Sequence, residues 1–462
     1  MLFTQIEFVC FIAVVFGYLL LVKNFRWQKI FLLVASYYFY GYWNYSFLLL
    51  ILLCTVVNYF AAIGIAASGV PRIKKSLLLF SLIFCLGILG YYKYCNFFIE
   101  SFNVAFKNFG LNLGSMDILL PVGISFFTFQ TLSYTIDVYR GQLKVCRNFF
   151  DFALFVAFFP QLVAGPIVRA SEFLPQLETP REMSYERFFL GTRQFMFGLF
   201  KKVFIADNLA VFVDACFESH QLFSGVTLWL AALAYALQIY CDFCGYSDMA
   251  IGLAKIMGYD FNVNFNLPYI SRSISEFWHR WHISLSTWLR DYLYIPLGGN
   301  RKGIRRTYIN LFLTMLLGGL WHGAAWTFVF WGGWHGLALG IHKFFKNRRK
   351  EEKSLPSLIS WFLTMTVVLT GWIFFRSTSF KQAYEILLSM VTFKSGIGWY
   401  EPVVVVILVL AVVYHLMCYF RKTRLWELRQ DSFYGTTVIF LLLLTSILFR
   451  PSGFQPFIYF QF

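Results

Sequence analysis

Four long stretches of this 462-residue chain carry no charged side chain: residues 47–66, 225–239, 358–375 and 437–449. Over the whole chain 59% of the residues are hydrophobic and only 13% are charged. Only helices and closed barrels satisfy every backbone polar group in lipid, and these stretches are too long and continuous for the strands of a barrel, which span about 10 residues. The sequence therefore predicts an all-α, polytopic integral membrane protein.

The basic residues form short clusters between the apolar segments. A net charge of +16 could suggest nucleic acid, but this placement is typical of cytoplasmic loops and of contact with anionic headgroups. The first apolar run, residues 7–22, has basic residues only after it, and residues 421–424 make the loop before the last apolar segment basic. We therefore expect both termini outside the cytoplasm, and we interpret Lys201 and Lys202 as a further cytoplasmic boundary.

We count about 11 transmembrane helices, together with re-entrant or interfacial helices, in one domain of residues 1–462. Residues 117–205 resemble simple spans less than the other segments do. Two prolines and a glycine interrupt the apolar run at residues 160–166. Broken helices at membrane depth are tolerated where they are buried in protein or line a cavity, so we expect this break to do one or the other.

One histidine, His322, lies in a glycine-rich turn at residues 318–326, between apolar arms at 307–320 and 324–342. Basic clusters flank the outer ends of both arms: Arg301, Lys302, Arg305 and Arg306 on one side, and Lys343, Lys346, Arg348, Arg349 and Lys350 on the other. The pattern predicts a hairpin that enters and leaves by the cytoplasmic face. At 1.5 Å per residue the first arm is about 21 Å long, against a hydrocarbon core of about 30 Å.

His322 is therefore expected inside the membrane, where an ionisable side chain marks a functional site. Imidazole is the natural general base near neutral pH. For His335 and His342, which lie in the second arm, we expect ordinary packing in the protein core.

Residues 275–291 combine histidines, tryptophans and hydroxyl groups. On a continuous helix His279, His282 and Ser286 share one side, beside a stripe of tryptophan and leucine. Such a helix is typical of the membrane interface, and its polar side can face a cavity at the same time. The loop that follows contains Asn300 and Arg301, which either receive phosphate groups or simply form a basic cytoplasmic loop.

Two carboxylates, Asp242 and Asp248, interrupt an otherwise apolar segment. They either hydrogen-bond to neighbouring helices or line a substrate cavity, because an unpaired charge is costly in lipid. Cys241 and Cys244 form the only CxxC pair in the chain. Within a helical apolar run we interpret them as buried structural thiols instead of a redox or zinc pair.

Two chemistries could use the histidines. Iron ligation, as in membrane desaturases and hydroxylases, needs many histidines, and only five of the seven lie between residues 279 and 342. The HxxH pair of His279 and His282 is not followed by HxxHH, and acidic ligands near it are few. Acyl transfer needs one base, access for two substrates and a mouth that accepts phosphate. The histidine count favours acyl transfer without a metal.

The chain contains several long motifs: the break at 160–166, the segment 242–248, Phe277-Trp278-His279-Arg280-Trp281-His282-Ile283-Ser284, the loop 295–301, Leu320-Trp321-His322-Gly323, Trp334-His335-Gly336 and residues 457–462. Together and in this order they resemble the motifs of the membrane-bound O-acyltransferase family, in particular its bacterial branch of alginate and peptidoglycan O-acetyltransferases. The match covers roughly residues 120–345, which we treat as the catalytic core, and the C-terminal residues.

The resemblance implies a ring of helices around a central funnel or tunnel, with His322 at the catalytic position and His282 at the family's second polar position. Acetyl-CoA would be the donor substrate, with no bound cofactor, and Trp321 would contribute to substrate binding. An extracytoplasmic partner protein would pass the acetyl group to a polysaccharide outside the bacterial cytoplasmic membrane. D-alanyl transfer to teichoic acid is the nearest alternative function. A further alternative is a transporter, which would cleave no thioester.

Overall fold

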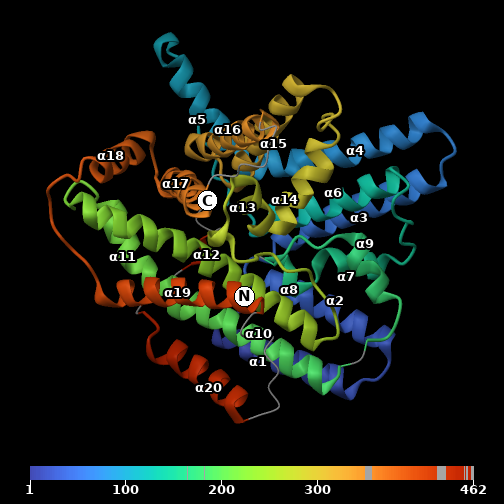
Figure 1. Cartoon of the computed structure of the whole chain (residues 1–462). Coiled ribbons are helices and arrows are strands. Elements are labelled where there is room, and N and C mark those ends of the chain that lie inside the picture. Colours follow the sequence, from blue (N-terminus) through green and yellow to red (C-terminus); the bar gives the residue numbers. More distant parts are fainter. Residues whose placement is uncertain are drawn as a thin grey trace. The chain divides into compact units, whose positions relative to one another are not determined.

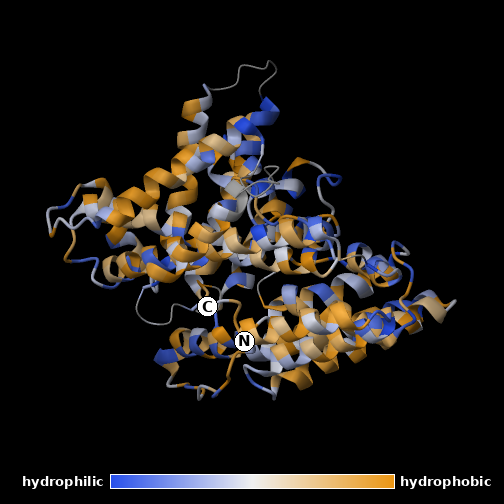
Figure 2. Ribbon diagram, turned by 90° about the horizontal axis from the view of Figure 1, so that it is seen from below, coloured by the Kyte–Doolittle hydropathy of each residue, from blue (hydrophilic) through white to orange (hydrophobic). Residues whose placement is uncertain are grey.

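The computed structural model describes residues 1–163, 165–181, 183–348, 356–423, 433–451, 453 and 456–458. Nearly all of the regular structure in these residues is helical, and their only β pairing is one bridge between Phe223 and Ile397. Hydrophobic residues run along most of the helices, and hydrophilic residues gather mainly in turns and at helix ends (Figure 2). The prediction of an all-α membrane protein is confirmed.

Among the described residues, five helices are long and apolar enough to cross a membrane: Phe47–Ala67, Pro71–Phe109, Gly225–Ile256, Ser357–Arg376 and Pro402–Arg421. Two shorter apolar helices are Ile6–Leu21 and Thr437–Leu448. These helices agree with a chain that crosses the membrane several times. The count of about 11 spans stays a prediction.

The packing divides the chain into two compact units. The first contains residues Met1–Thr192 and Met249–Asn262, and the second contains Arg193–Asp248 and Val263–Phe462. The organisation of residues 1–462 as a single domain stays a prediction. All of the histidines predicted to carry chemistry belong to the second unit.

The N-terminal unit begins with α1 (Ile6–Leu21), α2 (Phe25–Gly41), α3 (Phe47–Ala67), α4 (Pro71–Leu89), α5 (Cys95–Phe106), α6 (Ile124–Tyr139), α7 (Phe149–Ala157), α8 (Phe159–Leu162) and α9 (Ala170–Phe173). Helix α6 packs against α3 and α4 (Figure 1). The buried Asn58 of α3 joins all three, because its Oδ1 accepts hydrogen bonds from Ser81 of α4 and Thr135 of α6, each at 2.7 Å. Asn58 therefore gives the hydroxyl groups of Ser81 and Thr135 a hydrogen-bond partner inside an otherwise apolar bundle.

The predicted break after α7 is confirmed, although Ala164 lies outside the described residues. The backbone N–H of Phe159 turns away from the helix and donates to Ser36 Oγ at 3.1 Å. The carbonyl of Phe155 thereby loses its helical donor. The side-chain amides of Gln130 and Gln161 donate to this carbonyl instead, at 2.7 and 2.6 Å, so the break leaves it satisfied.

The remaining helices are α10 (Tyr185–Phe200), α11 (Asp207–Glu218), α12 (Gly225–Ile256), α13 (Ile274–Arg280), α14 (Ile283–Leu289), α15 (Ile304–His322), α16 (Trp326–Arg348), α17 (Ser357–Arg376), α18 (Phe380–Val391), α19 (Pro402–Arg421) and α20 (Phe433–Leu448). Helices α15 and α16 lie side by side and contact each other extensively (Figure 1). The predicted hairpin around His322 is therefore confirmed. Arg349 and Lys350 of its second basic cluster lie outside the described residues.

The first arm of the hairpin is longer than predicted. Helix α15 has 19 residues, about 28 Å at 1.5 Å per residue, because Arg305 and Arg306 continue the helix instead of preceding it. The depth of His322 in the membrane stays a prediction.

Small residues let the two arms of the hairpin pack at backbone distance. A Cβ added at Gly319 would lie 2.2 Å from the carbonyl oxygen of Phe328, and one added at Gly332 would lie 2.3 Å from that of Met315. Neither backbone can yield without moving a helix. The glycines are therefore required by the close approach of α15 and α16.

We expect Gly332→Ala to destabilise the protein by about 1–3 kcal/mol or more, as overpacking of a well-packed interface does. The neighbouring Gly333 is the matched control. A Cβ there meets only the side chains of Phe312 and Leu316, at 3.6 Å, and alanine favours a helix over glycine by about 1 kcal/mol. Thermal unfolding in detergent measures the difference. Equal melting temperatures for the two variants would contradict the close packing described above.

Candidate active site

A cavity of about 260 Å³ lies among helices α13, α14, α15 and α16 of the second unit. Helix α15 supplies one wall through a single face, at positions i, i+3, i+4, i+7 and i+11: Leu311, Thr314, Met315, Gly318 and His322. From Leu311 to His322 this face is about 16 Å long. The lining of the cavity therefore extends along one face of α15, and we refer to this elongated cavity as the channel.

His322 is the last residue of α15 and lines this cavity. Its side chain is nearly buried, at 4% exposure. The ring meets Trp331 edge to face, with centroids 5.0 Å apart, and Phe375 at 5.4 Å. The chain turns immediately afterwards at Gly323, where a Cβ would lie 2.2 Å from the ring of Phe328. His322 is thus an imidazole with aromatic walls at one end of the channel.

The prediction that residues 275–291 form one continuous helix is wrong. The structure breaks this helix at His282, which adopts a left-handed conformation with φ of 41° between α13 and α14. Asn264 holds the new helix start, because its carbonyl accepts from the N–H of Ile283 at 2.9 Å and its side chain accepts from the N–H of Ser284 at 3.1 Å. The amide of Asn264 in turn donates to Ser247 Oγ at 3.3 Å.

The break turns the side chain of His282 into the protein, where it is completely buried. Its ring meets the ring of Phe243 edge to face, with centroids 4.6 Å apart, and its centroid lies 6.3 Å from that of His322. The indole of Trp321 contacts both imidazoles, with its ring centroid 5.9 Å from that of His282 and 5.0 Å from that of His322. The structure therefore brings together His282, Trp321 and His322, which are separated by up to 40 residues in the sequence.

His279 and Ser286 also reach the channel, but not by sharing a helix with His282. Both line the cavity together with His322. His279 is exposed, and its Nδ1 donates to the carbonyl of Ser275 at 2.6 Å. The hydroxyl of Ser286 donates to the carbonyl of Trp281 at 3.2 Å. His282 is absent from the described lining of this cavity.

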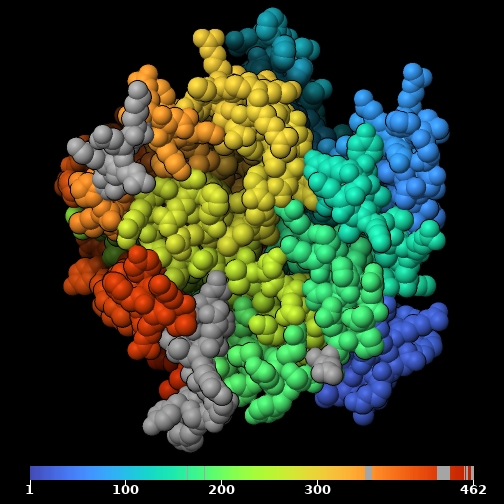
Figure 3. All heavy atoms as spheres, turned by 45° about the vertical axis from the view of Figure 1, so that its right-hand side comes forward, coloured from blue at the N-terminus to red at the C-terminus, as the bar shows by residue number. Residues whose placement is uncertain are grey.

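Asn300 and Arg301 are exposed on the loop that precedes α15, whose yellow atoms reach the surface in Figure 3. The side-chain amide of Asn310 fixes this loop by donating to the carbonyls of Leu297 and Gly299, at 3.3 and 3.0 Å. Arg290 and Tyr294 line the channel, whereas Asn300 and Arg301 are not among its described lining residues. A role for the loop in substrate binding stays a prediction.

Asp242 and Asp248 form ion pairs inside the second unit. Lys201 lies 2.7 Å from Asp248, and Lys202 lies 2.6 Å from Asp242 and 2.7 Å from Asp207. All four members of the two principal pairs are buried. The interpretation of Lys201 and Lys202 as a cytoplasmic boundary is therefore wrong, because each cation is buried beside a carboxylate instead of facing water or headgroups.

The same carboxylate of Asp242 accepts a hydrogen bond from the backbone N–H of Ile458 at 2.7 Å. Phe457, beside it, contacts the ring of Phe243 at 5.8 Å. This geometry supports the interpretation of Asp242 as a residue that joins neighbouring segments. Its role in substrate binding, and that of Asp248, stays a prediction. Residues 459–462 of the C-terminal motif lie outside the described residues.

Cys241 and Cys244 are buried, as predicted. In the part of the chain that the structure describes, no three His, Cys, Asp or Glu side chains gather closely enough to hold a metal ion. His335 is also buried and packs among tryptophan rings.

The sequence did not predict the positions of Trp278, Trp331 and Asn264 around the site. The spacing of residues 311–322 on one face of α15 was the pattern that could have revealed the channel.

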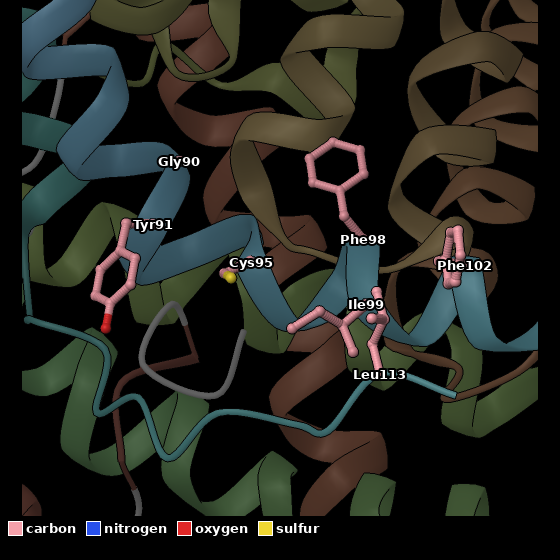
Figure 4. A pocket seen from close by; sticks show the side chains of 7 residues that line it. All are labelled: Gly90, Tyr91, Cys95, Phe98, Ile99, Phe102 and Leu113. Carbon is pink, nitrogen blue, oxygen red and sulfur yellow. The ribbon is translucent and has the colours of Figure 1, made fainter. Parts of the chain in front are cut away.

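A second cavity, of about 460 Å³, lies in the N-terminal unit, on α5 and the short π-helix Gly90–Tyr94 before it (Figure 4). Its lining is almost entirely apolar, and Tyr91 and Cys95 carry its only side-chain heteroatoms. Two asparagines hold the extended segment beside it, because the side chain of Asn96 binds both backbone polar groups of Met116 and that of Asn103 binds those of Leu113. This cavity offers no histidine or carboxylate for catalysis.

Comparison with known proteins identifies relatives that match most of the chain. The chain is 43% identical over 464 residues to the probable alginate O-acetylase of Pseudomonas putida, covering 95% of each protein. It is 40% identical to the peptidoglycan O-acetyltransferase of Helicobacter pylori, over 81% of this chain and 76% of that protein. The teichoic acid D-alanyltransferase of Bacillus subtilis is 31% identical over 54% of this chain and 65% of that protein.

The model of the membrane-bound O-acyltransferase family matches residues 33–376, which is well over half of the chain. The match includes both histidines of the site and every residue that lines the channel. This chain belongs to the membrane-bound O-acyltransferase family and is an acyltransferase.

Proposed function

We propose that this protein is an O-acetyltransferase that uses acetyl-CoA and serves the O-acetylation of a polysaccharide outside the bacterial cytoplasmic membrane. The observation that carries the proposal is the position of His322, at the end of a narrow cavity and 6.3 Å from the ring of His282. A general base at the end of a channel is what acyl transfer requires, because donor and acceptor must meet there without free access of water.

The dimensions of the channel favour a slender donor. At about 260 Å³ it lies below the roughly 300–1,000 Å³ of pockets that enclose whole drug-sized ligands. The acetylated pantetheine arm of acetyl-CoA fits this description, with the nucleotide left outside. Arg290 is exposed where it lines the channel, and the N–H groups of its guanidinium that do not donate to the carboxylate of Asp291 are suitable to meet phosphate.

In the proposed reaction His322 takes the proton of an acceptor hydroxyl as its oxygen attacks the thioester carbonyl. The C–O bond forms, the C–S bond breaks, and the thiolate of CoA takes the proton back from the imidazolium. His282 orients the acceptor or stabilises the negative charge that develops on the carbonyl oxygen. The step balances without a metal or redox cofactor.

The names of the similar proteins support an extracytoplasmic polysaccharide as the final acceptor. Alginate and peptidoglycan are the polymers named for the relatives of 43% and 40% identity. An extracytoplasmic partner protein would complete the transfer, and both termini of this chain would lie on that side of the membrane. D-alanyl transfer to teichoic acid remains the second candidate, supported by a relative that is similar over a smaller share of the chain.

The experiment that tests the function offers the purified protein two radiolabelled donors, acetyl-CoA and a D-alanyl thioester on its carrier protein. We expect cleavage of acetyl-CoA that increases when an acceptor polysaccharide or oligosaccharide is added. Turnover of the D-alanyl donor alone would replace the proposal with the second candidate. Failure to cleave either thioester would indicate a transporter instead.

Gly318 offers a test of the channel itself. It lines the cavity one turn before His322, and a Cβ there would lie 3.0 Å from Leu289 Cδ1. We expect Gly318→Val to raise the KM for acetyl-CoA about 10-fold or more, the scale of discrimination that one or two methyl groups give in a tight apolar site. Gly340→Val is a control on α16, where a Cβ meets only Tyr308 at 3.6 Å. An unchanged KM in Gly318→Val would show that the donor uses another route.

A further inference from the structure

His335 lies on α16 and is completely buried. Its ring packs against two indoles, Trp331 with centroids 4.9 Å apart and Trp278 at 5.2 Å. Within the described residues neither nitrogen of the imidazole has a hydrogen-bond partner. The described contacts of the ring are therefore packing contacts with aromatic side chains.

Trp331 joins this buried imidazole to the site. Its indole meets His322 edge to face, with centroids 5.0 Å apart and planes at 86°, and it also lines the channel. The same indole contacts His335. One side chain thus separates the two histidines and forms part of the channel wall beside His322.

Gly371 of α17 closes the other side of His335. A Cβ added to Gly371 would lie only 2.6 Å from Nε2 of His335. The imidazole consequently occupies the room that a side chain at position 371 would take. Because interiors are close-packed, a ring confined between Gly371 and Trp331 leaves the indole little freedom to move away from His322.

We propose that His335 is a positioning residue: confined by Gly371, it holds Trp331 against His322 and so fixes the catalytic imidazole. The proposal rests on the proposed role of His322 as general base. It assigns to His335 no proton transfer and no contact with substrate. A displacement of about 1 Å in a catalytic group can cost about 10²-fold in rate, so the expected effect is on kcat and not on KM.

The first test compares variants that change the volume on either side of the ring. We expect His335→Ala to lower kcat for acetyl transfer about 10- to 100-fold with little change in KM. His335→Leu, which keeps the bulk and removes both nitrogens, should retain most of the activity. Gly371→Ala should also lower kcat, and the double variant Gly371→Ala/His335→Ala should recover part of the loss because the new methyl group occupies the space that the imidazole left.

The double variant makes this a thermodynamic cycle, so coupling between the two positions is measured directly. Full activity in His335→Ala, or equal loss in His335→Leu and His335→Ala when both remain folded, would overturn the proposal. Simple additivity of the losses in the double variant would do the same.

The second test does not depend on turnover. Diethyl pyrocarbonate modifies accessible imidazoles, and peptide mass spectrometry reports the rate for each histidine. We expect faster modification of His322 in His335→Ala, and the wild-type rate in His335→Leu. His220, which bonds to Glu385 at 2.8 Å, is the internal reference. An unchanged rate at His322 in His335→Ala would refute the positioning role even if the protein proved to transfer another acyl group.

Discussion

Replacement of His322 by alanine is expected to lower acetyl transfer by about 10²–10⁴-fold, the range that general acid–base catalysis contributes. The imidazole lies at the end of the channel, and aromatic rings enclose it on several sides. No hydroxyl acceptor is ionised near neutral pH, so removal of the base leaves the acceptor a weak nucleophile. Steady-state assays with radiolabelled acetyl-CoA on purified, folded protein measure the loss.

The control for this experiment is His220→Ala, which removes a histidine that bonds to Glu385 and contributes nothing to the lining of the channel. It should retain wild-type turnover. His282→Ala should lose less than His322→Ala, because an orienting group contributes geometry and not the proton acceptor. Turnover near the wild-type rate in folded His322→Ala would refute the assignment of the base.

The largest expected loss of stability follows from Asp248→Ala. Its carboxylate lies 2.7 Å from Nζ of Lys201, and both side chains are more than nine-tenths buried. Gln194 donates to the same carboxylate at 3.3 Å. Removal of one partner from a buried ion pair leaves a charge without compensation and costs about 3–5 kcal/mol. The melting temperature in detergent should fall accordingly.

The double variant Asp248→Leu/Lys201→Met is the informative companion. Replacing both charges by apolar side chains of similar size is often neutral or stabilising, so it should melt close to the wild type. If the single and double variants were equally destabilised, the effect would come from packing and not from the unpaired lysine. Acetyl transfer by the folded double variant would also show that Asp248 need not bind substrate.

The sequence by itself determined the class of the molecule and the region of the site. Uncharged stretches such as residues 47–66 can lie only in an apolar environment, whatever surrounds them. Local rules were also enough for the hairpin, because the first basic flank, the first arm, the turn, the second arm and the second basic flank follow one another along the chain. The break at residues 160–166 followed from proline and glycine for the same reason.

Only the tertiary structure decided which polar groups meet. The helical spacing of His279 and His282 predicted a shared face, but the side chain of the distant Asn264 stabilises a left-handed residue at His282 and turns its ring inward. Lys201 resembled a loop residue until its buried carboxylate partner was located. The contact of Trp331 with both His322 and His335 likewise depends on α15, α16 and α17 packing together. The periodicity of a sequence describes one helix at a time. The free energy of an ion pair or a ring contact depends on the distance between two helices, and the order of residues along the chain does not give that distance.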